Sequence, residues 1–175
     1  MQVNWSEIAR ELGEERTTDS GATMMSSSLR LGSRVAEALL GDDLLQDAVE
    51  VAARYAPGMG AAESLLTLLR SHRAADYCYE RFRSETDPER RRGYADVLRN
   101  AAGESGLPWV EEFWADADES VQVLGAKMLE GLVNQRLVEP DEAEPILRAG
   151  EQHENPSVRE FTGFARVAFE RVFRE

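Results

Sequence analysis

Short breaks rich in Gly, Pro and Asp divide the sequence after Ser33 into nine segments with helical periodicity. No window shows the polar–apolar alternation between hairpin turns that is typical of β-strands. Because the breaks are short, as is usual between antiparallel neighbouring helices, we predict an all-α fold. The expected helices lie at about residues 34–40, 43–55, 60–71, 73–84, 88–102, 108–115, 119–135, 141–152 and 156–173.

The composition supports helices and a genuine core. Ala, Leu, Glu and Arg make up nearly half of the 175 residues, and these types favour helix over strand. The apolar fraction of 42% is sufficient for a core, and the length indicates one domain over residues 1–175. Residues 4–15 are expected to form a short amphipathic helix, and residues 17–33 a weak helix or a mobile loop.

Three of the expected helices open in a similar way. Asp87, Asp118 and Asn155 stand at N-cap positions that lie 31 and 37 residues apart, and a helix precedes each of them. An apolar stripe with steps of three and four residues follows each cap. One helix pair cannot bury both its apolar faces alone, so this recurrence predicts stacked pairs with a continuous core.

These openings resemble the second helices of HEAT repeats, α-helical solenoids built from antiparallel helix pairs. The family's opening is Asp or Asn, then Val-Arg, and it is matched by Asn155, Val158 and Arg159. The match is weaker at 118–129, where Gln replaces the Arg, and at 87–98, where Arg replaces the Val.

The resemblance implies a right-handed α–α superhelix of about four to five antiparallel pairs, clearest over residues 73–173. It also implies that the second helices line a concave face and that the protein binds other proteins. The spacing is shorter than the usual repeat of about 40 residues. A non-repetitive helical bundle is therefore the alternative fold.

The net charge of −13 is unevenly distributed. Residues 1–50 carry −6, 51–100 carry +2, 101–150 carry −8 and 151–175 carry −1. Nucleic acid is not expected as the main partner, because phosphate binding needs concentrated positive charge, and an anionic membrane is disfavoured likewise. An arginine cluster nevertheless lies in the positive block, at Arg81, Arg83, Arg90, Arg91, Arg92 and Arg99.

Catalytic and metal-binding patterns are weak in this sequence. Cys78, the single cysteine, excludes a disulfide framework, and it lies about 240° around a helix from His72. His72 and His153 are 81 positions apart, too far for a helical metal-binding pair. We therefore expect no catalytic residue, cofactor or metal, and a non-enzymatic role. With no secretory signal and no apolar run of bilayer length, a cytoplasmic location is expected.

The segment 107–119 combines large aromatic residues with carboxylates. Either both tryptophans pack in the core, or at least one reaches the surface, where acids around it would suit a basic partner. The predicted partner-binding residues are Trp109, Glu111, Glu112, Trp114, Asp116, Asp118 and Glu119.

Three functions are open at this point. The first is a protein–protein interaction module that binds a basic protein, such as a small bacterial adaptor or an immunity protein that neutralises a basic toxin. The second is an enzyme that processes DNA bases, as some HEAT-like folds do, using the arginines at 81–99. The third is a structural protein that forms homo-oligomers through its terminal helices; the sequence does not determine the oligomeric state.

Overall fold

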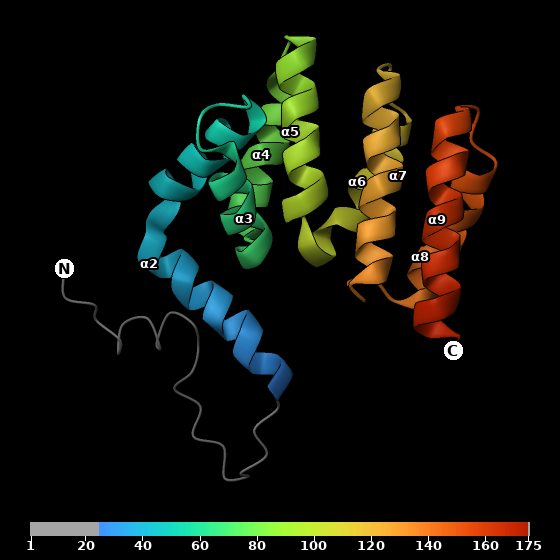
Figure 1. The fold of residues 1–175 in the computed structure, drawn as a ribbon, viewed down its shortest axis with the longest axis horizontal. Coiled ribbons are helices and arrows are strands. Elements are labelled where there is room, and N and C mark those ends of the chain that lie inside the picture. The colour runs from blue at the N-terminus through green and yellow to red at the C-terminus, as the bar shows by residue number, and fades with distance from the viewer. Residues whose placement is uncertain (1–24, 175) are drawn as a thin grey trace.

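The structure is a computed structural model that describes residues 25–174, and within this range it is all α-helical (Figure 1). The predicted all-α class is thus confirmed, while the predicted helix at 4–15 lies outside the described residues. The helices are α2 (Met25–Ala53), α3 (Met59–Leu69), α4 (His72–Ser84), α5 (Pro88–Ala101), α6 (Leu107–Trp114), α7 (Glu119–Asn134), α8 (Pro140–Glu151) and α9 (Pro156–Phe173), with a 3-10 turn, η1, at Gly103–Gly106.

The three recurring caps are formed as predicted. The Asp87 carboxylate accepts hydrogen bonds from the backbone N–H groups of the second and third residues of α5, at 3.1 and 2.9 Å. Asp118 accepts from Ser120 N at 2.8 Å, and Asn155 accepts from Ser157 N at 2.9 Å. These side chains satisfy N–H groups that lack an intrahelical acceptor, so α5, α7 and α9 begin at the residue after each cap.

Helix α2 differs from the prediction. The two expected helices, 34–40 and 43–55, are one element that starts at Met25 and is kinked at Gly41, which has φ 75° and ψ 166°. Glycine reaches a positive φ without a Cβ clash, which is why the chain changes direction here. The expected weak helix or loop at 17–33 is helical from Met25 onward; residues 17–24 lie outside the described part.

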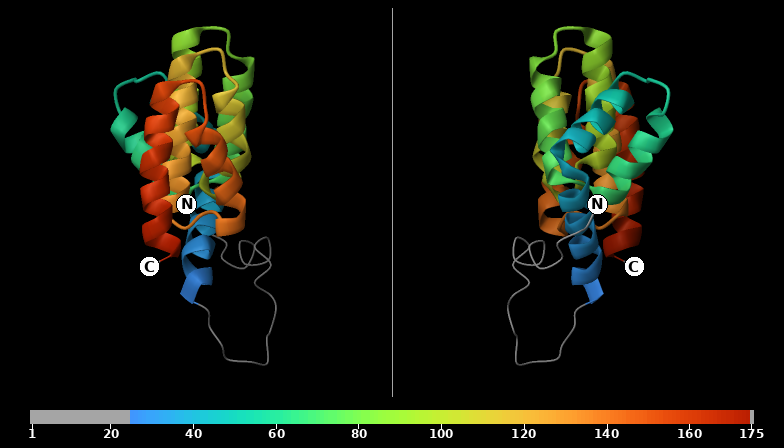
Figure 2. Two further views of the ribbon diagram at one scale, coloured as in Figure 1. Left: turned by 90° about the vertical axis from the view of Figure 1, so that its right-hand side faces the viewer. Right: turned by 90° about the vertical axis from the view of Figure 1, so that its left-hand side faces the viewer.

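The helices pack in sequential pairs that form two layers (Figures 1 and 2). Helices α5, α7 and α9 lie side by side in front, with α4, α6 and α8 behind them. Within the pairs α4 packs on α5, α6 on α7 and α8 on α9, and between pairs α5 packs on α7 and α7 on α9. Helix α2 closes the N-terminal side by packing on α3, α4 and α5.

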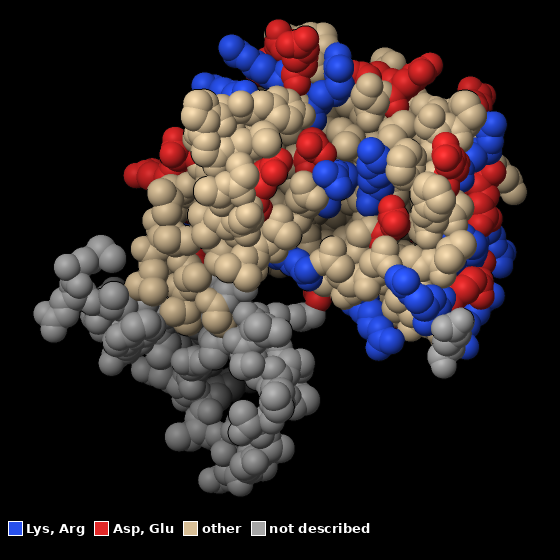
Figure 3. Space-filling view, in the orientation of Figure 1, with Lys and Arg blue, Asp and Glu red and all other residues tan. Residues whose placement is uncertain are grey.

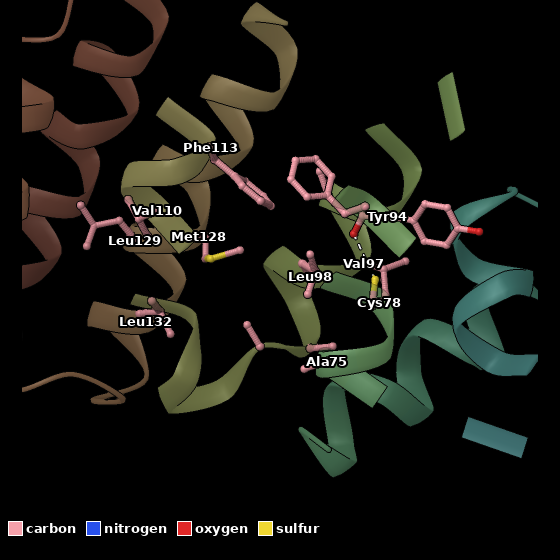
Figure 4. Packing of buried hydrophobic residues seen from close by; sticks show 14 of the residues in the cluster. Ala75, Cys78, Tyr94, Val97, Leu98, Val110, Phe113, Met128, Leu129 and Leu132 are labelled. Carbon is pink, nitrogen blue, oxygen red and sulfur yellow. Dashed lines mark hydrogen bonds between the residues drawn. The ribbon is translucent and has the colours of Figure 1, made fainter. Parts of the chain in front are cut away.

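The core is one apolar cluster that runs through the stack from Leu45 to Phe169. Figure 4 shows its central part, where α4 and α5 meet α6 and α7. Phe82 of α4 contacts Phe113 of α6 with ring centroids 4.9 Å apart, so aromatic side chains bridge the first helices of neighbouring pairs. Within the described residues, no helix has the length and apolarity needed to cross a membrane.

Gly93 sets the distance between α2 and α5. A Cβ at this position would overlap the carbonyl oxygen of Ala53 and lie 2.8 Å from its carbonyl carbon. The close approach of the two helices therefore depends on the absence of a side chain at residue 93.

Candidate functional site

The structure divides the seven predicted partner-binding residues among four environments. Trp109 and Glu112 lie on the side of α6 that contacts α4. Glu111 is exposed, about 200° around the helix from Trp109, and faces away from α4. Trp114 and Glu119 line a pocket at the ends of α6 and α7. The remaining two, Asp116 and Asp118, form ion pairs with arginines of α5.

An aromatic pair joins α4 to α6. The ring of Tyr79 stacks on that of Trp109, with centroids 4.9 Å apart and planes inclined by 16°. The Tyr79 hydroxyl donates to Glu112 at 2.5 Å. Burial, followed by this hydrogen bond to Glu112, raises the pKa of Tyr79 above its ordinary value, so the hydroxyl stays protonated and remains the donor.

Carboxylates surround this aromatic pair. Asp76, Glu80 and Arg83 share a face of α4 with Tyr79, because residues three and four apart lie on one side of a helix. Arg83 lies 3.9 Å from Glu112, whereas the side chains of Asp76 and Glu80 are exposed and have no ion pair within the described residues. We call this area the α4–α6 surface; it comprises Asp76, Tyr79, Glu80, Arg83, Trp109 and Glu112.

Asp116 is held tightly inside the protein. Its side chain is 7% exposed and receives two hydrogen bonds from the guanidinium of Arg91, at 2.9 and 2.5 Å. Burial acts to raise the pKa of Asp116, but the hydrogen bonds from Arg91 and the Asp118 N–H outweigh it and hold the pKa below its ordinary value. Asp116 is therefore a structural anion that links the α6–α7 connection to α5.

The predicted arginine cluster is largely neutralised by similar pairs. Arg81 binds Glu50, Arg92 lies 2.9 Å from Asp118, and Arg99 binds Asp96. Figure 3 shows basic and acidic side chains side by side over the face formed by α5, α7 and α9. Charges that are segregated along the sequence are thus interleaved in space.

Glu50 forms the most extensive polar cluster. It accepts hydrogen bonds from Tyr77 and Tyr94, both at 2.9 Å, and pairs with Arg54 at 2.5 Å and Arg81 at 3.0 Å. Burial opposes ionisation, yet the two tyrosines and two arginines lower the pKa of Glu50 below its ordinary value. The cluster therefore joins α2 to α4 and α5 through a carboxylate.

Trp114 is a core residue, unlike Trp109. It is 6% exposed, and two glycines make room for its indole ring. A Cβ at Gly125 would lie 3.0 Å from Trp114 Cδ1, and one at Gly150 would lie 2.7 Å from Trp114 Cη2. The ring thus spans from α7 to α8. Of the two tryptophans in segment 107–119, Trp109 therefore reaches the surface in part, whereas Trp114 packs in the core.

The structure does not bring the candidate catalytic residues together. Cys78 is fully buried and donates to the Tyr94 carbonyl at 3.3 Å, whereas His72 is exposed at the start of α4. Burial raises the pKa of the Cys78 thiol well above its ordinary value, so the nucleophilic thiolate is disfavoured. Within the described residues, no group of His, Cys, Asp and Glu side chains is arranged to hold a metal ion.

Sequence reasoning missed the contribution of α4 to this site. The predicted partner-binding residues include none from α4, although Asp76, Tyr79, Glu80 and Arg83 follow the spacing of one helix face. That spacing was the available signal. The contact with Trp109, 30 positions away, becomes visible only in the fold.

Comparisons with known proteins identified no family. No family model, no curated protein and no solved structure matches this chain. What the structure shows is an all-helical protein with sequential pairwise packing.

Proposed function

We propose that this protein is a non-catalytic interaction module that binds a basic segment of another protein on the α4–α6 surface. The observation that carries the proposal is the stacked pair Tyr79–Trp109, which is partly exposed and bordered by unpaired carboxylates. Aromatic rings supply apolar contact area at low entropic cost, and the acids attract and orient a basic chain.

The helix arrangement supports a HEAT-like solenoid as the scaffold. The second helices α5, α7 and α9 pack directly on one another, whereas long side chains such as Phe82 and Tyr79 connect the first helices α4 and α6. Wider spacing in one layer than in the other curves a stack of helix pairs, with the second helices on the inner side. On this proposal the α4–α6 surface lies on the outer, convex side.

The distribution of free charge supports a protein partner over DNA. Arg81, Arg83, Arg91, Arg92 and Arg99 each lie within 4 Å of a carboxylate, so they are compensated before any phosphate approaches. Among small all-helical proteins without a catalytic centre, an acidic interaction surface suits an adaptor or an inhibitor. An immunity protein that neutralises a basic toxin in bacteria is one form of this proposal.

The test compares two variants that remove the same charge. The surface variant carries Asp76→Asn and Glu80→Gln, and the matched control carries Asp141→Asn and Glu160→Gln, both exposed acids on other helices. Each protein is immobilised, and proteins retained from a lysate of the native organism are identified by mass spectrometry at increasing salt.

We expect a basic protein whose retention falls with salt and falls about fivefold in the surface variant, because two exposed ion pairs contribute roughly 0.2–1 kcal/mol each. The control variant should stay within about twofold of the original chain on the same scale. Equal losses in both variants would show that net charge alone attracts the partner. Salt-independent retention would also contradict the proposal.

A further inference from the structure

The outer side of α9 carries two exposed apolar side chains. Five large apolar side chains are exposed among the described residues, and only Phe164 and Val167 share a helix. Phe164 is 49% exposed and Val167 is 68% exposed, and residues three apart lie next to each other on one helix face. Figures 1 and 2 show α9 at the C-terminal end of the stack. The two side chains therefore form an apolar patch that the described residues leave uncovered.

This patch belongs to a longer stripe along the helix. Glu160, Phe164, Val167 and Arg171 follow one another at steps of four, three and four residues, and all four are exposed. That spacing places them on one side of α9, while the buried residues of the helix face the core on the other side. Steps of three and four are also the spacing of a seam between two packed helices. We call this stripe the α9 face.

Phe164 is held in place by its neighbour Phe161. The two rings meet edge to face, with centroids 5.7 Å apart and planes inclined by 76°. Phe161 is itself partly buried, and Nζ of Lys127 in α7 lies 4.7 Å from the centroid of its ring. A side chain that is already ordered loses less conformational freedom when a partner covers it, so Phe164 suits the centre of an interface.

The two charged residues of the α9 face have no opposite charge beside them. The Glu160 carboxylate forms no ion pair or hydrogen bond within the described residues. Arg171 donates to the Asn134 side-chain oxygen at 2.6 Å but pairs with no carboxylate in the same part of the chain. At 1.5 Å per residue, about 16 Å of helix separates Glu160 from Arg171, so they do not pair within one chain. The face thus has a free anion at one end and a free cation at the other.

We propose that the α9 face binds a second copy of this chain, by antiparallel pairing of two α9 helices about a two-fold axis. Glu160 and Arg171 have the same midpoint in the sequence as Phe164 and Val167. A two-fold axis at that midpoint places Phe164 on the partner's Val167 and Glu160 against the partner's Arg171, and each contact occurs twice. Parallel pairing would instead set like charges against each other at both ends, which disfavours it.

The charge balance of the α9 face favours a second copy over the basic partner of the proposed function. One acid and one arginine leave the stripe without net charge, so it does not select a strongly basic segment. The contact is small, because α9 has 18 residues and offers a strip about 27 Å long and about 10 Å wide, well below the roughly 800 Å² per partner of a standard interface. We therefore expect weak pairing that depends on concentration. The α4–α6 surface shares no residue with this face, so the inference is independent of the proposed function.

The first experiment measures the mass of the full chain by sedimentation equilibrium from about 10 µM to about 1 mM. The original chain is compared with the variant Phe164→Ser/Val167→Ser. The matched control is Leu44→Ser/Leu68→Ser, which removes two exposed apolar side chains from α2 and α3. Far-UV circular dichroism verifies that each variant keeps its helices.

The second experiment tests the antiparallel register by charge reversal. Glu160→Arg and Arg171→Glu each create like-charge contacts at both ends of the proposed pairing, so each variant alone should be monomeric. An equimolar mixture of the two restores both opposite-charge contacts between unlike chains and should dimerise. The matched controls are Glu111→Arg and Arg90→Glu, which reverse exposed charges on α6 and α5 and should each dimerise like the original chain.

We expect the original chain to dimerise and the Phe164→Ser/Val167→Ser variant to dimerise at least about 30-fold more weakly. The mixture of charge-reversal variants should recover the original affinity within about threefold. A chain that stays monomeric throughout would overturn the proposal, including the case in which residues 1–24 of the same chain or a different protein covers the α9 face. Unchanged dimerisation of the serine variant, or a mixture as monomeric as its components, would also overturn it.

These outcomes are separable from the proposed function. If the chain is monomeric while retention of a basic protein still depends on the α4–α6 surface, the pairing is wrong and the function stands. If the mixture dimerises but the α4–α6 variant retains its partner fully, the pairing stands and the proposed surface is wrong. In the retention experiment the density of immobilised chains sets their pairing, so the Glu160→Gln change in its control does not affect this distinction.

Discussion

Replacing Gly93 by Ala should loosen the junction between α2 and α5. The new Cβ would overlap the carbonyl oxygen of Ala53 and lie 2.8 and 3.2 Å from its carbonyl carbon and Cα. All three are backbone atoms, so no side-chain rotation can relieve the contact and the two helices must separate. Around this junction Ala52, Ala53 and Val97 are 1–2% exposed, so separation also disturbs the core.

The size of the effect follows from two opposing contributions. Overpacking of a core typically costs about 1–3 kcal/mol, and a backbone clash falls at or above the upper end of that range. Ala in a helix interior is favoured over Gly by about 1 kcal/mol. We therefore expect a net loss of roughly 2 kcal/mol, which lowers the Tm of a protein of this size by about 4–8 °C.

A matched control separates the clash from the change of residue type. Gly131 lies within α7, and the nearest atom to a Cβ there is Nε2 of the flexible Gln135 side chain, at 3.8 Å. Gly131→Ala should therefore raise the Tm, since it gains helix propensity of about 0.5–1 kcal/mol without a clash. Thermal unfolding followed by far-UV circular dichroism measures both. A Gly93→Ala protein as stable as the original chain would refute the close packing of α2 on α5.

Two further predictions concern buried polar groups. Glu50→Gln should lower the unfolding free energy by about 1–3 kcal/mol at neutral pH. Because the native pKa of Glu50 lies below 4.5, this difference should shrink as the pH falls from about that value through the native pKa. Urea titrations at several pH values measure the difference, and one that does not change with pH would contradict the prediction. Cys78, fully buried with a raised pKa, should resist a thiol reagent in the native protein and react at once in urea; rapid native labelling would show that α4 does not pack as described.

Much of the secondary structure could be predicted because its determinants are local. Asp87, Asp118 and Asn155 act within three residues of their own positions, and the expected starts of α5, α7 and α9 coincide with the observed ones. The break near Gly41 predicted two separate helices, at 34–40 and 43–55, whereas the segments on both sides form one element kinked at Gly41. Helix propensity alone does not show whether the segments on either side of a break form one kinked helix or two separate helices.

The site was less predictable because its contacts join distant parts of the chain. Trp109 and Trp114 look alike in sequence, yet Trp109 is partly exposed beside Tyr79 while Trp114 fills the space left by Gly125 and Gly150. The partners of Asp116 and Asp118 on α5 lie more than 20 positions away. Whether a carboxylate is free or compensated depends on such pairs, and these arise only when helix pairs stack.

The sequential packing of the helices affects how the molecule unfolds. Helix α9 packs on α7 and α8, whereas α2 packs on α3, α4 and α5, so the two ends of the stack are held by separate sets of contacts. On the proposed solenoid arrangement, stability is a sum of contributions from neighbouring units, and a terminal unit loses one interface where a central unit loses two. Amide hydrogens of α8 and α9 should then exchange faster than those of α5 and α7. Opening of the α8–α9 pair also disrupts the α9 face, so the proposed pairing of two chains would protect the C-terminal end of the stack from unfolding first.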